Sequence, residues 1–127
     1  MKRSTLLALL ACMTQLADVA CASVDVPRTQ TLCGWFENPT PGNAWLHDRT
    51  GEWVIGIQGE HQAEGDWPTF SRSQWVKTNN SYGYGCACIK GTINIATREV
   101  ISIASARARP LSVCRKDRAL KEHGLTK

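Results

Sequence analysis

The sequence lacks the short motifs that mark common catalytic and metal-binding sites. No Gly-x-Ser-x-Gly, His-Glu-x-x-His or Cys-x-x-Cys segment occurs in its 127 residues, and His47, His61 and His123 lie far apart in the chain. These absences argue against an activated-serine hydrolase, a zinc protease and a zinc site built from paired cysteines. We therefore predict no catalytic residues, no metal site and no cofactor, and favour a non-enzymatic function.

Long apolar runs are lacking as well. Two cations precede a short apolar run at 6–11, and small residues follow it. The run is far shorter than the about 20 apolar residues that a membrane-spanning helix needs. The order of cations, apolar residues and small residues is typical of a cleaved signal peptide, and 20–22 fits its cleavage site. We predict a signal peptide at 1–22 and a single disulfide-containing domain at 23–127, with no transmembrane segment in the mature chain.

A different processing route would leave the protein on a membrane. Cys12 and Cys21 each follow residues that partly match a lipoprotein signal, and acylation of either would anchor the chain. We favour an exported protein that is periplasmic or secreted, with the lipoprotein as the alternative.

Four cysteines remain after the predicted signal peptide: Cys33, Cys86, Cys88 and Cys114. An even number in a small exported domain indicates two disulfides. Cys86 and Cys88 lie two residues apart on a predicted strand, with side chains about 6.6 Å apart on one face. That separation is near the upper limit for a relaxed disulfide. One of the two is therefore expected to pair with Cys33 and the other with Cys114, in either combination.

Charge is unevenly distributed along the chain. The segment 33–66 carries six acids and one Lys or Arg, whereas 67–127 carries eleven Lys and Arg and three acids. The basic residues are spaced out with no interleaved aromatics, which argues against nucleic-acid binding. We interpret them as a solvated C-terminal helix; a basic face for an anionic partner is the alternative.

Hydrophobic periodicity and turn residues predict a mainly β, small α+β fold. It comprises an antiparallel sheet of about five strands with one or two short helices, stapled by disulfides. The expected segments are a strand at 32–36, a hairpin of 44–47 and 52–58, a helical turn at 71–74, a hairpin of 82–96 and 100–106, and a helix at 112–121.

Tryptophans and glycines give more local expectations. We assign Trp35, Trp45 and Trp53 to the core because they lie on predicted strands. Gly83 and Gly85 leave one face of the longest strand without side chains, so another group must approach closely there. We expect a tryptophan to fill that space.

The segment 59–70 is acidic, contains glycine and is predicted to be a surface loop. It ends in Trp-Pro-Thr-Phe, and an exposed tryptophan can stack on a sugar or anchor a protein interface. Glu64, Asp66, Trp67 and Phe70 are the candidate binding residues.

Four stretches of the chain, 33–43, 45–53, 64–68 and 82–88, resemble a family of small exported bacterial proteins, the domain of unknown function 4087. The similarity covers about residues 32–120. It implies a bacterial source and an envelope location, and it brings no activity, substrate or site residues.

We predict an exported binding or inhibitor module that acts on an envelope or secreted protein or a glycan. One alternative is a periplasmic thiol–disulfide protein that uses Cys86 and Cys88, which would need a nearby cation or a helix N-terminus to activate a thiolate. The other is a structural envelope protein without a discrete ligand.

Overall fold

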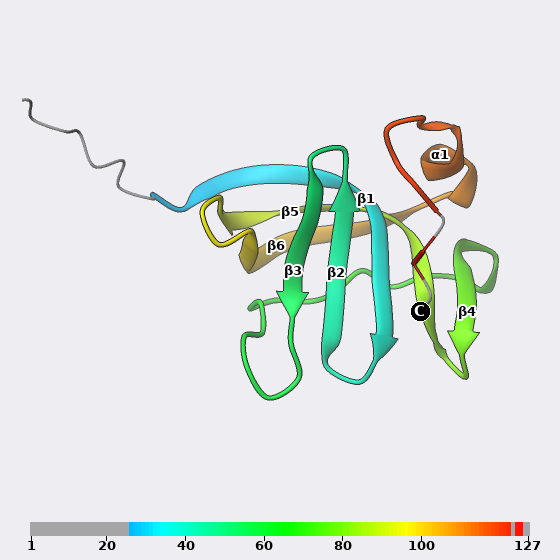
Figure 1. Ribbon diagram of the computed structural model, residues 1–127, viewed down its shortest axis with the longest axis horizontal. Coiled ribbons are helices and arrows are strands. Elements are labelled where there is room, and N and C mark those ends of the chain that lie inside the picture. The colour runs from blue at the N-terminus through cyan, green and yellow to red at the C-terminus, as the bar shows by residue number, and fades with distance from the viewer. Residues whose placement is uncertain (1–25, 123, 126–127) are drawn as a thin grey trace, which may run out of the picture.

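The computed structural model describes residues 26–122, 124 and 125, so the predicted signal peptide, with Cys12 and Cys21, lies outside the described residues. The elements in chain order are β1 (Arg28–Thr40), β2 (Asn43–Asp48), β3 (Gly51–Gly56), the 3-10 turn η1 (Arg72–Gln74), β4 (Trp75–Asn79), β5 (Tyr82–Asn94), β6 (Glu99–Arg109) and α1 (Leu111–Lys116) (Figure 1). The mainly β fold with short helices is confirmed.

Five of the strands form a closed ring. Antiparallel pairs join β1 to β2, β2 to β3, β6 to β5, and β5 back to β1, while β3 meets β6 in parallel at Val54 and Glu99. β4 adds a sixth strand beside the first residues of β5. The expectation of a purely antiparallel sheet is therefore wrong, because the chain crosses from β3 to β6 over a long sequence separation that local patterns do not reveal.

Both predicted hairpins are present. In the β2–β3 turn Asp48 accepts a hydrogen bond from the Thr50 backbone N–H at 2.7 Å, and Asn94 caps the β5–β6 turn in the same way through Ala96. Short Asx-type bonds of this kind stabilise turns without a partner from elsewhere in the chain. They explain why these hairpins could be recognised from sequence.

The inside of the closed sheet holds the main core. Alternate residues of each strand point inward. The buried members are Leu32, Phe36, Ala44, Leu46, Trp53, Ile55, Ala63, Ala87, Ile89, Ile93, Val100 and Ile103. Trp53 can be buried because its Nε1 donates to Asp48 at 2.9 Å. Trp45 belongs to neither buried cluster and is half-buried on the outside of β2, so its assignment to the core is wrong.

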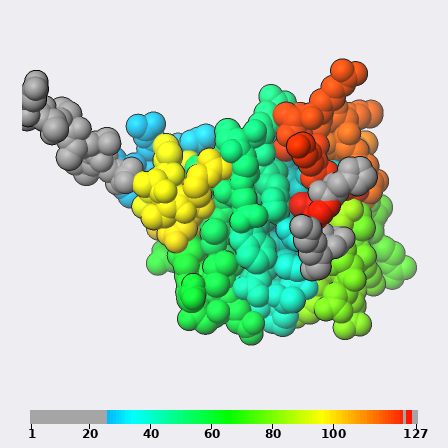
Figure 2. Space-filling view, viewed as in Figure 1, coloured from blue at the N-terminus to red at the C-terminus, as the bar shows by residue number. Residues whose placement is uncertain are grey.

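A second cluster lies outside the ring, and we call it the outer cluster. It consists of Trp35, Tyr84, Cys86, Cys114 and Leu125. The segment that follows α1, red in the space-filling view, lies against the side of the closed sheet (Figure 2). Trp35 is completely buried there and meets Tyr84 edge to face at 5.4 Å between ring centroids.

The predicted helix 112–121 is too long. α1 ends at Lys116, and Asp117 has extended backbone angles. The Asp117 carboxylate accepts the Ala119 backbone N–H at 3.0 Å and also bonds Arg49 of the β2–β3 turn. An aspartate that bonds nearby backbone in this way competes with helical hydrogen bonding and ends the helix.

The expectation that a tryptophan fills the space beside Gly83 and Gly85 is also wrong. A Cβ on Gly83 would collide with the Val76 backbone carbonyl, and one on Gly85 would come within 2.6 Å of the Phe70 ring and the Gln74 carbonyl. The groups that approach are thus β4, a strand that the sequence did not predict, and a phenylalanine.

Candidate functional site

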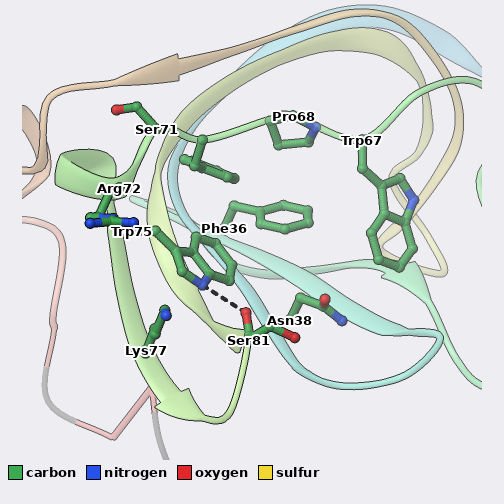
Figure 3. A pocket seen from close by; sticks show the side chains of 10 residues that line it. Phe36, Asn38, Trp67, Pro68, Ser71, Arg72, Trp75, Lys77 and Ser81 are labelled. Atoms are coloured by element: carbon green, nitrogen blue, oxygen red, sulfur yellow. Dashed lines mark hydrogen bonds between the residues drawn. The ribbon is translucent and has the colours of Figure 1, made fainter.

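Four aromatic rings from three parts of the chain converge at one end of the closed sheet. Phe36 comes from β1, Trp67 and Phe70 from the segment before η1, and Trp75 from the start of β4. The ring centroids of Phe36 lie 5.8 Å from Trp67, 5.7 Å from Phe70 and 6.4 Å from Trp75. In Figure 3 the Phe36 ring lies between the two indoles.

Glycine and register fix this arrangement. Trp75 pairs with Gly85 across β4 and β5, and the missing side chain of Gly85 leaves room for the Phe70 ring. Phe70 and Trp75 then pack with their centroids 4.8 Å apart. The Trp75 indole is held in place because its Nε1 donates to the Ser81 carbonyl at 3.0 Å (Figure 3).

The rings border a hollow of about 390 Å³, which we call the aromatic pocket. Its lining consists of Phe36, Asn38, Trp67, Pro68, Phe70, Ser71, Arg72, Trp75, Lys77 and Ser81. Phe36 is buried at its base, whereas the other three rings are half-buried. Aromatic walls with a few polar groups are typical of small-ligand sites, and the volume lies in their range.

The polar groups of the aromatic pocket are partly available to a ligand. Asn38 uses its amide nitrogen to bond the carbonyls of Thr40 and Asn43, at 2.8 and 2.6 Å. Its Oδ1 accepts no hydrogen bond from the described residues. Arg72 and Lys77 line the pocket, and neither forms an ion pair with an acid in the described part of the chain. The pocket therefore offers an acceptor, two cations and aromatic faces together.

The structure brings together only part of the predicted binding loop. Trp67 and Phe70 line the aromatic pocket, while Glu64 and Asp66 are exposed and lie outside its lining. Glu64 is instead attached to β6, where its backbone N–H and C=O bond Ile101 and Ile103 at 3.0 and 2.7 Å. The segment lacks a strand or helix, as a loop should, but its apolar residues turn toward the core.

Sequence reasoning missed Phe36, Trp75, Arg72 and Lys77. The signal in the sequence was weak: aromatic and basic residues recur at 70, 72, 75 and 77 without strict alternation, and the turn residues Asn79 and Asn80 separate them from the two glycines of β5. That pattern could have indicated a second strand against Gly83 and Gly85.

Both disulfides use the expected partners. Cys33 bonds Cys88 across β1 and β5, and Cys86 bonds Cys114 of α1. Cys86 and Cys88 thus belong to different disulfides, and the Cys-x-Cys segment does not form a redox pair with itself. Cys86 and Cys114 are buried, whereas Cys33 is exposed.

Titratable groups elsewhere form pairs rather than a catalytic arrangement. His47 Nε2 lies 2.7 Å from a Glu37 carboxylate oxygen on the outside of β1 and β2. Tyr84 donates to Glu122 at 2.9 Å, and burial together with this carboxylate raises the pKa of the phenol. Within residues 26–122, 124 and 125, no three His, Cys, Asp or Glu side chains are grouped so as to hold a metal ion, and no helix there is long and apolar enough to cross a membrane.

Comparison with known proteins identifies the family but no function. Residues 27–121 match the family model described as "Protein of unknown function (DUF4087)". No curated protein and no solved structure matches the chain.

Proposed function

The chain belongs to the DUF4087 family, and we propose that it is an exported binding protein that holds an acidic sugar residue in the aromatic pocket. The observation that carries this proposal is the convergence around one hollow of four rings and two cations that have no acidic partner among the described residues. A fully buried ring cluster would only stabilise the fold, but three of these rings keep exposed surface.

Sugar chemistry fits the pocket better than a purely apolar ligand. A pyranose ring presents C–H groups on its faces. The partly positive hydrogen atoms of these groups are attracted to the negative face of an aromatic ring. Its hydroxyls can donate to Asn38 Oδ1 and bond Ser81. A carboxylate on the sugar would meet Arg72 and Lys77, with the bidentate geometry that a guanidinium favours. Small closed sheets of five strands are among the scaffolds that bind oligosaccharides, although architecture alone does not determine function.

Export supports a glycan of the cell envelope or its surroundings. The two disulfides fit an oxidising compartment, and the chain begins with the features of a signal peptide. Neither a thiol–disulfide role nor a purely structural role uses the aromatic pocket, so both rank below binding.

The test is a titration of the purified mature protein with oligogalacturonate, followed by tryptophan fluorescence and calorimetry, with neutral cello-oligosaccharides in parallel. Binding of the acidic sugar should weaken about tenfold or more in Trp67→Ala, since anchoring aromatics carry much of a binding energy. Arg72→Gln and Lys77→Gln should remove the preference for the acidic over the neutral sugar.

Trp45→Ala is the matched control, because Trp45 is a half-buried tryptophan outside the aromatic pocket. It should leave the titration unchanged. If Trp45→Ala and Trp67→Ala reduce binding equally, or if neither sugar binds, the proposal is wrong.

A further inference from the structure

The outer face of β5 and β6 gathers basic side chains that are dispersed in the sequence. Cross-strand register places Arg107 opposite Cys88 and Arg109 opposite Cys86. Lys90 lies between Thr31 of β1 and Ser105 of β6. Lys90 and Arg107 are therefore diagonal neighbours on one face of the sheet, a relation that places such residues roughly 7–8 Å apart. We call the set Lys90, Arg107 and Arg109 the basic face.

These three cations have no counter-charge among the described residues. Arg49, Arg98 and Arg115 each contact an Asp or Glu. Lys90, Arg107 and Arg109, in contrast, take part in no ion pair or side-chain hydrogen bond with the described part of the chain. Lys90 and Arg107 are exposed and Arg109 is half-buried. Like charges this close repel one another, and an anion bound between them would relieve the repulsion.

The basic face is hollowed. Thr31, Cys88, Lys90, Ser105, Ala106 and Arg107 line a depression of about 400 Å³. No acid from the described part of the chain contributes to that lining, and Thr31 and Ser105, which carry hydroxyls, are the cross-strand partners of Lys90. Asp48 and Asp117 border the neighbouring groove that Arg109 also lines, but both already bond partners, Trp53 and Arg49 respectively.

We propose that the basic face binds sulfate or phosphate groups of an extended anionic glycan. Arg107 can bind two oxygens of one such group, Lys90 supplies a point charge, and the hydroxyls donate further bonds. No aromatic ring of the described residues lines the depression, so a base would have nothing to stack on, which disfavours nucleic acid. Val26, Ile95 and Val113 are the large apolar side chains exposed in the described residues, and none lines the depression, which disfavours insertion into a lipid surface.

This site is independent of the aromatic pocket. Lys77 pairs with Gly83, and Lys90 lies seven residue positions further along β5, which is roughly 23 Å along the strand at the rise of extended backbone. Loss of one site should leave the other intact, so the two proposals fail separately.

The experiment measures binding of dextran sulfate to the mature protein by calorimetry at several salt concentrations, with unmodified dextran as the uncharged probe. Dextran sulfate should bind with an affinity that falls as salt rises, and dextran should not bind. Each of Lys90→Gln and Arg107→Gln should weaken binding about tenfold, because each removes charge-assisted hydrogen bonds.

Lys121→Gln is the charge-matched control, since Lys121 is an exposed cation that lies outside the basic face. It should reduce affinity far less, and Trp67→Ala should not reduce it. Equal losses in Lys121→Gln and Arg107→Gln would show that only net charge matters and would overturn the proposal, as would an absence of binding at low salt.

Discussion

Two adjacent residues of β1 belong to two aromatic clusters that differ in how far they are buried. Trp35 points outward into the outer cluster, and Phe36 points inward to the base of the aromatic pocket. The outer cluster is covered by α1 and the segment after it, and Trp35 has no exposed surface. No described segment covers the aromatic pocket in this way, and three of its rings remain half-buried. Coverage, rather than the number of rings, distinguishes the cluster that stabilises the fold from the one that is free to bind.

The cover over the outer cluster is held by three kinds of bond. The Cys86–Cys114 disulfide ties α1 to β5. Glu122 accepts from both Tyr84 and Arg115, at 2.9 Å in each case. Arg49 reaches Asp117 from the β2–β3 turn. Nothing comparable spans the aromatic pocket among the described residues.

The largest effect should come from breaking the outer cluster itself. Trp35→Ala should lower the free energy of unfolding by about 3–5 kcal/mol, because it opens a cavity in a fully buried site. Trp67→Ala should lower it by less than about 2 kcal/mol, because the Trp67 ring already keeps part of its surface in water. Urea unfolding of the two variants measures the difference directly.

A milder variant protects that comparison if Trp35→Ala fails to fold. Trp35→Phe keeps a ring and removes Nε1, which has no hydrogen-bond partner among the described residues. It should cost clearly less than Trp35→Ala. A Trp35→Ala protein that folds and is no less stable than Trp67→Ala would contradict the distinction between the two clusters.

Removing the Cys86–Cys114 disulfide, which holds the cover, should give the next largest loss of stability. Cys86→Ala/Cys114→Ala opens a link between residues 28 apart in sequence, and the chain-entropy model assigns such a link about 3–4 kcal/mol. The melting temperature should fall accordingly. The affinity for oligogalacturonate, measured at a temperature where the variant is folded, should stay at the wild-type level. A loss of binding in this variant would mean that the aromatic pocket depends on the cover, and the two clusters would not be separable.

Sequence predicted the parts of this comparison that depend on nearby residues. The hairpins followed from alternation and turn residues, and the cysteine pairing followed from the spacing of Cys86 and Cys88. Trp67 and Phe70 were recognised because an aromatic residue after an acidic loop is conspicuous. The burial of Trp35 was also predicted correctly.

The remainder depends on contacts between distant segments. β4 is short and has no alternating pattern, so Trp75 and Lys77 were not seen as pocket residues. The parallel contact of Val54 with Glu99 joins segments 45 residues apart. The basic residues were assigned to a helix, and the helix ended early because Asp117 bonds Ala119 and Arg49. Lys90, Arg107 and Arg109 come together only through strand register.

The smallest expected effect concerns the exposed edge of the cover and depends on pH. The hydrogen bonds from Arg49, with a contribution from the Ala119 backbone, hold the pKa of the Asp117 carboxyl below its usual value. A carboxyl with a lowered pKa in the folded state stabilises the protein fully above its usual pKa and loses that contribution as the pH falls through the folded-state value.

Asp117→Asn should therefore be slightly less stable than the wild type near about pH 7, and the gap should close toward about pH 2. The pair is largely exposed on the Arg49 side, which keeps the effect small. Melting temperatures of both proteins across this range measure the gap, and a gap that is constant with pH would show that Asp117 acts through the shape of the turn rather than through its charge.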